Sequence, residues 1–453
     1  MSGEQQTRYV QSPSAGSRPG ARPGTERVAR PLSAEDATIL ALENEVVAGH
    51  MCKVMLLDHP LDLGQLRSSI EGRLDLAPEL CLRLGEIDGQ PWWVPARQVD
   101  VDAQVGEPDQ AGTDEASLPA TVAGLFRQRL DRSRPLWRID LIPRLPAGGS
   151  ALVWRIHHAL ADGMTAMRMA SAVLWDQGQA STAGRAPGKP SLAPGAASAA
   201  GHHRLAGLLA AARQAPQPWL RSPFSGHIDA RRTVAFAAGG LDELRHAAHA
   251  VDGATVNDAV LTIVAGGLRQ WLETRHGQFG DIRVKVPVSL HAAPGLAGDD
   301  RGEPGNRDSF FCLDLPLGSA DPLERLSAIR HESRVRKQGH DAEELDTLMR
   351  ALGRVPPLRQ FAERVLAHPR SFALNVSNVP GPRQPVQVLG APVRALYSLA
   401  EIREEHALRV AVTSLAGTLS FGLVADPTLL PDVDHLASCM QAEAAALIAC
   451  KPA

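Results

Sequence analysis

The 453-residue sequence has few aromatic residues and no patterned cysteines. Aromatic residues make up 4% of the chain, so its core must be packed mainly from aliphatic side chains. Its five cysteines are scattered, with no CxxC pair, which excludes the usual zinc or redox spacing and indicates free thiols in a reducing compartment. The net charge of −3 gives no overall basic field, so we expect no nucleic-acid partner.

Long apolar runs are also missing. No stretch reaches the roughly 20 apolar residues of a membrane-spanning helix, and the N-terminus lacks the apolar centre of a signal peptide. We therefore expect a cytoplasmic protein, with peripheral contact at the inner membrane face left open. The GxSxG, HExxH and dinucleotide-binding signatures are absent as well, which argues against a serine hydrolase or a metal-dependent enzyme and predicts no metal site.

Composition divides the chain into two halves of mixed α/β (α+β) class. Residues 1–30 are rich in Gly, Pro, Ser and Arg and are predicted to be a disordered tail. Residues 31–176 form the first half and residues 231–453 the second. An Ala/Gly/Pro-rich linker over residues 177–230 joins them.

Hydrophobic periodicity predicts the elements of each half. In the first half, strands are expected at Met51–Leu57, Trp92–Val94, Trp137–Ile142 and Ser150–Ile156, and helices at Leu63–Arg73, Ala120–Leu130 and Met164–Leu174. In the second half, strands are expected at Thr233–Phe236, Val284–Leu290, Ser309–Leu315, Ala373–Val376, Val410–Thr413 and Thr418–Leu423. Its helices are expected at Leu241–Ala250, Val256–Glu273, Leu323–Lys337, Ala342–Gly353, Pro357–Leu366 and Asp432–Ile448.

The strongest chemical signal is the run HHALADG, from His157 to Gly163. An apolar strand delivers the two histidines, and Gly163 allows a tight turn into the next helix. His158 suits proton abstraction from a hydroxyl, with His157 in a supporting role. Asp162 is expected to hold the loop, more plausibly by pairing with an arginine than by reaching the ring. The alternative is a structural histidine pair followed by an Asp-Gly turn, and the run alone does not decide between the two.

Five further blocks surround this run: Leu130–Trp137 (LDRSRPLW), Thr255–Leu261 (TVNDAVL), Pro287–Leu290 (PVSL), Gly305–Arg307 (GNR) and Ser377–Pro382 (SNVPGP). Together with HHALADG, they resemble in kind and order the motifs of the bacterial wax ester synthase/diacylglycerol acyltransferase family, over roughly residues 31 to 440. The sequence departs from that pattern at His291, where an arginine commonly follows PVSL, and in the acidic loop after it. The preference of this protein for its acceptor or its acyl chain could therefore differ from that of other family members.

The resemblance implies the two-domain CoA-dependent acyltransferase fold, similar to chloramphenicol acetyltransferase, with an active-site tunnel between the domains. It implies transfer of a long acyl chain from acyl-CoA, as co-substrate and without another cofactor, to diacylglycerol or a long-chain fatty alcohol. His158 would be the general base. A lipid acceptor leaves association with a membrane or lipid-droplet surface open. Two alternatives remain: a condensation-type enzyme that uses a carrier-protein thioester, and a non-catalytic lipid-binding or scaffold protein of the same fold.

The same blocks supply candidate substrate-binding or oxyanion residues, which are Asn257, Asp258, Pro135, Leu136, Trp137, Ser377 and Asn378. Asn257 stands at a helix start, where its amide and the helix N-terminus favour negative charge, but asparagine is also a common helix cap. Residues 135–137 suit either the wall of a substrate channel or ordinary core. Residues 380–382, which follow the last pair, also fit a plain turn.

Overall fold

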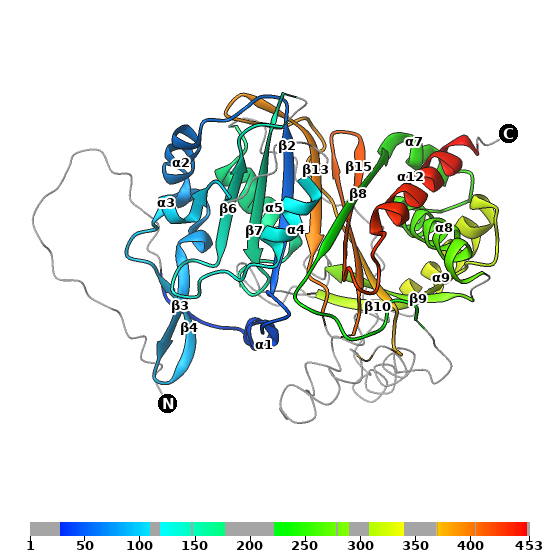
Figure 1. Cartoon of the computed structure of the whole chain (residues 1–453), viewed down its shortest axis with the longest axis horizontal. Coiled ribbons are helices and arrows are strands. Elements are labelled where there is room, and N and C mark those ends of the chain that lie inside the picture. The colour runs from blue at the N-terminus through cyan, green and yellow to red at the C-terminus, as the bar shows by residue number, and fades with distance from the viewer. Residues whose placement is uncertain are drawn as a thin grey trace, which may run out of the picture.

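The computed structural model describes residues 28–108, 118–145, 148–176, 222–277, 280–289, 308–338, 368, 370–403 and 405–450. Within these ranges the chain forms two halves that stand side by side, each built on a six-stranded sheet with helices packed against it (Figure 1). The predicted mixed α/β class is confirmed.

The first sheet has the strand order β12-β13-β2-β7-β6-β5. Its strands, in that order, are Gln387–Val388, Ala391–Ala400, His50–Leu57, Ser150–His157, Trp137–Ile142 and Val105–Gly106. β2 and β7 are buried along their whole length, which explains why they read as apolar runs without alternation. They pair antiparallel with His50 opposite His157. The double histidine therefore lies where the central strand β7 ends.

Short helices and a small sheet complete the first half. The helices are α1 (Ala34–Leu42), α2 (Leu63–Glu71), α3 (Val101–Gln104), α4 (Leu118–Phe126) and α5 (Gly163–Val173), with two 3-10 turns at Leu74–Leu76 and Pro78–Cys81. The small sheet has the order β1 (Arg30–Pro31), β4 (Gln90–Pro95) and β3 (Leu82–Ile87). α1 begins after Ser33, whose Oγ accepts a hydrogen bond from the Asp36 amide at 3.0 Å, and it ends just before Glu43, which enters the site below.

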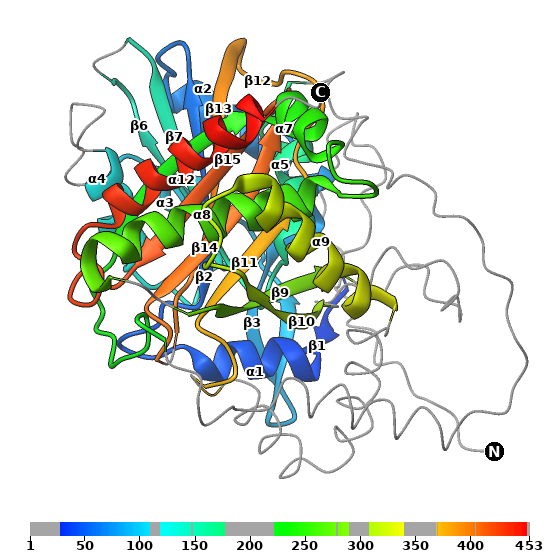
Figure 2. The same cartoon turned by 90° about the vertical axis from the view of Figure 1, so that its right-hand side faces the viewer.

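The second sheet has the strand order β10-β9-β11-β14-β15-β8. Its strands, in that order, are Asp308–Leu315, Ile282–Ser289, Leu374–Val379, Leu408–Leu415, Thr418–Ala425 and Thr233–Gly240. Its helices are α7 (Leu241–Ala248), α8 (Val256–His276), α9 (Pro322–Gln338) and α12 (Val433–Ala449). These helices cover one face of the sheet (Figure 2). The long α8 is buried along its apolar residues, as its sequence predicted.

Strands β12 and β13 correct the predicted division of the chain. Their residues lie in the second half of the sequence, yet β13 pairs along β2 and so belongs to the first sheet. β13 also packs against β15, where a side chain at Gly422 has no room because a Cβ would lie 2.1 Å from the Ser398 carbonyl oxygen. The two sheets are therefore closely packed at β13.

Two predicted boundaries also shift. Arg30, assigned to the tail, lies in β1 and pairs with Trp93 of β4. Residues 1–27 lie outside the described residues. The end of the predicted linker is structured, since Phe224 is fully buried in the core of the second half. The rest of the linker, the acidic loop after β9 and the two helices predicted over residues 342–366 lie outside the described residues. Most other predicted elements are confirmed within a few residues of their bounds.

Candidate active site

The double histidine sits in a turn that backbone contacts hold from several sides. The His157 amide donates to the Leu136 carbonyl at 3.0 Å, and the His158 amide donates to the Gly49 carbonyl at 3.0 Å. Asp162 then caps α5, because its Oδ1 accepts from the Thr165 amide at 2.7 Å. Asp162 thus holds the loop as a helix cap, and its expected pairing with an arginine stays a prediction.

His157 is fully buried and is oriented by contacts with both ring nitrogens. Its Nδ1 accepts a hydrogen bond from the Ala159 amide at 3.1 Å, which leaves the proton on Nε2. Nε2 lies 3.3 Å from Oε2 of Glu43. These contacts fix the ring, and the His157 side chain is 1% exposed, so the geometry favours the supporting role.

Glu43 is in turn held by Arg132, whose Nε and Nη2 donate to Glu43 Oε2 at 3.0 and 2.8 Å. Burial raises the pKa of the Glu43 carboxyl, but hydrogen bonds from His157 and Arg132 outweigh it and leave the pKa below its ordinary value. A charged carboxylate therefore faces His157. Arg132 comes from the LDRSRPLW block, so that block and the HHALADG run meet at Glu43.

Gly49 makes room for His157. Its φ of +73° lies in the region that favours glycine, and a Cβ there would lie 2.6 Å from His157 Nε2. The backbone of the preceding loop can approach the imidazole only because this residue has no side chain.

His158 is half-buried, and it occupies a strongly cationic environment. Burial lowers the pKa of its imidazole well below the ordinary value, and the positive charge of Arg409, which comes next in weight, lowers it further, as do Arg403 and Lys53. A neutral imidazole is the form that can accept a proton. The lowered pKa therefore favours the neutral imidazole of His158.

Lys53 is a buried cation on β2, inside an otherwise apolar strand. Its Nζ donates to Ser398 Oγ on β13 at 2.7 Å. Burial lowers the pKa of this amine to about 8, and the charge of Asp162 opposes part of that effect. Lys53 therefore contacts β13 through Ser398, and its charge acts on His158 in the histidine turn.

Residues 135–137 are buried in the core of the first half. Leu136 is fully buried and Trp137 nearly so, and the Trp137 indole N–H donates to the Leu80 carbonyl at 2.8 Å. The Pro135 carbonyl accepts from the Gln104 amide nitrogen at 2.9 Å. These contacts favour the core-packing interpretation over a channel wall. The block still matters to the site, because the Leu136 carbonyl holds the His157 amide.

At the start of α8, Asn257 and its neighbour Asp258 have different roles. Thr255 is the helix cap, and Asp258 closes a capping box by accepting from the Thr255 amide at 2.8 Å and from its hydroxyl at 2.7 Å. The alternative interpretation of Asn257 as the cap is therefore wrong. Asp258 is buried and engaged in the box through Oδ2, which favours a structural role. Asn257 remains half-buried in the first turn.

Ser377 and Asn378 lie in β11, which continues to Val379 beyond the predicted strand end. Because side chains alternate along a strand, the two residues point to opposite faces of the sheet and cannot line the same site. Val379 shares a face with Ser377 and packs against the histidine turn, since a Cβ at Gly163 would lie 2.7 Å from Val379 Cγ2. Of the pair, Ser377 is therefore on the face that reaches the turn.

Sequence reasoning missed Glu43, Lys53 and Arg409 as parts of the site. A signal existed for Lys53, because a charged residue inside an apolar strand must be paired or functional. Among the described residues, no group of His, Cys, Asp and Glu is arranged to hold a metal ion. Within the same part of the chain, the helices are too short or too polar to cross a membrane.

Comparisons with known proteins agree with this geometry. Residues 32–215 match the model of the wax ester synthase/diacylglycerol acyltransferase catalytic domain, and residues 304–447 match the model of the WS/DGAT C-terminal domain. A putative diacylglycerol O-acyltransferase of Mycobacterium tuberculosis H37Rv is 31% identical over 450 residues, which cover 90% of this chain and 88% of the relative.

Two solved structures extend the comparison to the fold. The wax ester synthase/diacylglycerol acyltransferase from Marinobacter aquaeolei VT8 is 25% identical with a TM-score of 0.67, covering 92% of this chain and 98% of that one. The starter condensation domain of rhizomide synthetase, solved with C8-CoA, is 16% identical with a TM-score of 0.56, covering 92% and 94%. The predicted two-domain acyltransferase fold is confirmed.

Proposed function

Because this chain belongs to the wax ester synthase/diacylglycerol acyltransferase family of O-acyltransferases, we propose that it transfers a long-chain acyl group from acyl-CoA to a lipid alcohol. The acceptor is diacylglycerol, a long-chain fatty alcohol or both, and His158 is the general base. The observation that carries the proposal is the half-buried His158, kept neutral by its surroundings and fixed at the end of β7.

The proposed reaction needs a single proton shuttle. The His158 imidazole accepts the hydroxyl proton as the acceptor oxygen attacks the thioester carbonyl of acyl-CoA. The tetrahedral intermediate collapses, the C–S bond breaks, and the imidazolium returns the proton to the departing CoA sulfur. Asn257 is the proposed oxyanion donor, since its amide is not used to cap α8. No cofactor besides the acyl-CoA co-substrate takes part.

The donor and acceptor are proposed to meet in a tunnel between the two halves. Support comes from the histidine turn, which packs against Val379 of the second half through Gly163. A lipid acceptor dissolves in a membrane or lipid droplet, so we propose that the protein works at such a surface as a peripheral protein.

The pH dependence follows from the lowered pKa of His158. The base is active when neutral, so kcat/KM should stay level down through pH 6.5, the ordinary histidine value, and fall only at lower pH. Arg409→Gln removes a nearby positive charge, which should raise the His158 pKa and move the acid limb to higher pH. A pH profile measured with palmitoyl-CoA tests this. An acid limb at or above pH 6.5 in the unsubstituted protein would contradict it.

The substrates can be assigned in one competition assay. Purified protein is incubated with labelled palmitoyl-CoA and equal amounts of hexadecanol and dioleoylglycerol, and the ester products are separated. We expect labelled wax ester, triacylglycerol or both. Product only from an acylated carrier protein would favour the condensation-type alternative, and bound acyl chains without any product would favour a lipid-binding role.

A further inference from the structure

We propose that Glu401, which follows β13, is a positioning residue for the catalytic histidine. It acts through residues 43–49, which connect α1 to β2 and which we call the bracing loop. The inference rests on the proposed role of His158 as general base, and it assigns to the second half of the sequence a part in holding that base.

Each end of the bracing loop contacts one histidine. At its start, Oε2 of Glu43 lies 3.3 Å from Nε2 of His157. At its end, the Gly49 carbonyl accepts the His158 amide at 3.0 Å. A shift of the loop therefore moves both contacts that set the direction of the histidine turn.

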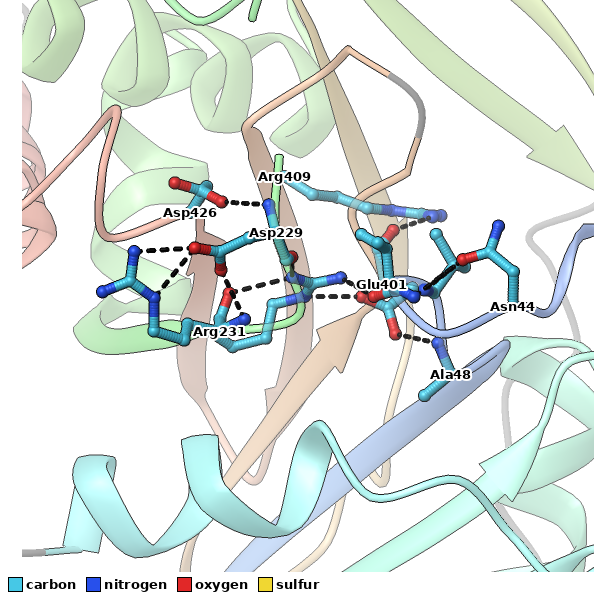
Figure 3. Close-up of polar contacts among 10 residues, drawn as sticks. Asn44, Ala48, Asp229, Arg231, Glu401, Arg409 and Asp426 are labelled. Atoms are coloured by element: carbon cyan, nitrogen blue, oxygen red, sulfur yellow. Dashed lines mark hydrogen bonds and ion pairs between the residues drawn. The ribbon is translucent and has the colours of Figure 1, made fainter. Parts of the chain in front are cut away.

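The middle of the bracing loop is held by a buried ion pair. Oε2 of Glu401 accepts the Ala48 amide at 3.1 Å, and its Oε1 accepts from Nε of Arg232 at 2.9 Å (Figure 3). Arg232 reaches the loop as well, since its Nη2 donates to the Val46 carbonyl at 2.6 Å. The side chains of both ions are at most 5% exposed. The pair thus clamps the loop by its backbone.

The clamp is anchored in the second half of the molecule. Arg232 immediately precedes β8, and its segment is tied down where the Asp229 amide donates to Asp426 Oδ2 at 2.9 Å (Figure 3). Arg409 on β14 donates to the Glu401 carbonyl at 3.1 Å, and its charge also acts on His158. The ion pair is therefore fixed from two strands of the second sheet.

Burying such a pair is costly unless its hydrogen-bonding groups are satisfied, and a hydrophobic pair of similar size is often as stable. Stability alone thus does not explain why the second carboxylate oxygen of Glu401 accepts a hydrogen bond from the Ala48 amide of the loop. Positioning does give one, because a displacement of about 1 Å at a catalytic group can cost about 100-fold in rate. The placement of Glu401 accordingly fits control of the histidine turn.

The test compares Glu401→Gln with a matched buried ion pair elsewhere. Arg325 and Glu443 form such a pair between α9 and α12, with side chains at most 4% exposed. We expect Glu401→Gln to lower kcat roughly 10- to 100-fold while the KM for palmitoyl-CoA changes less than about 2-fold. Glu443→Gln should keep kcat within about 2-fold, even at an equal fall in Tm.

A milder substitution tests the same loop without disturbing a buried charge. Asn44 is exposed, and its Oδ1 accepts the amides of Val46 and Val47 at 2.8 and 2.9 Å. Asn44→Ala should loosen the bracing loop, keep Tm nearly unchanged, and lower kcat several-fold at constant KM. This variant decides the matter if Glu401→Gln does not fold.

The outcomes separate this inference from the proposed function. If His158→Ala is inactive while Asn44→Ala and any folded Glu401→Gln keep the unsubstituted kcat, the positioning role is overturned and the general base stands. Equal losses in Glu401→Gln and Glu443→Gln at equal Tm would also overturn it. If His158→Ala is fully active, the proposed base itself is wrong.

Discussion

Replacing His158 with alanine is expected to lower the rate of ester formation by about 1,000-fold, with little change in acyl-CoA binding. General acid–base groups typically contribute 100- to 10,000-fold, and the turn is held by its backbone, so removing the imidazole should leave the turn in place. The measurement is release of CoA thiol and of labelled ester under saturating substrate. Acyl-CoA affinity is measured separately, by titration without acceptor.

A matched control is His246→Ala. This histidine is exposed on α7, and its Nδ1 contacts the Asp242 carbonyl within the same helix, so the substitution should leave the rate unchanged. Equal product from the unsubstituted protein and His158→Ala would show that another group accepts the proton. A fall in acyl-CoA affinity equal to the fall in rate would instead make His158 a binding residue.

The largest stability effect is expected from Asp140→Ala, which should lower the free energy of unfolding by about 3–5 kcal/mol. Oδ2 of Asp140 on β6 pairs with Nη2 of Arg155 on β7 at 2.8 Å, and both side chains are at most 2% exposed. Nη1 of Arg155 also donates to the Leu125 carbonyl of α4 at 2.9 Å. Removing the carboxylate would leave a buried guanidinium on β7, the strand that carries the histidines, without its carboxylate partner.

Urea unfolding followed by tryptophan fluorescence measures this effect. The control is Glu273→Ala in α8, which breaks a partly exposed ion pair with Arg269 and should cost about 0.5 kcal/mol or less. If Asp140→Ala unfolded at the same urea concentration as this control, the buried pair would contribute no more than a surface one.

Sequence reasoning located the elements whose patterns are local. The strand Trp137–Ile142 has the predicted bounds, because apolar residues alternate there with Arg138 and Asp140, which is the period of a strand. β13 was missed because only part of it is buried and because its pairing partner β2 lies far away along the chain. A strand that is stabilised mainly by such a distant partner leaves little trace in its own sequence.

The site divided in the same way. The histidine run was visible as a motif, whereas the roles of Glu43 and Glu401 depend on contacts with His157 and Ala48 that exist only after folding. Asn257 shows the limit of composition, since asparagine at a helix start suggests a cap. The residue two positions earlier, Thr255, has taken that role.

The course of β13 has a consequence for exchanging parts between relatives. A fragment ending in the linker would keep the histidine run but would leave the long edge of β2 open, and open strand edges invite pairing between copies. Hybrids made to move acceptor preference from one relative to another should therefore carry residues 386–402 together with the first half. The part that has to be exchanged as a whole is the first sheet, whose strands come from two distant segments of the chain.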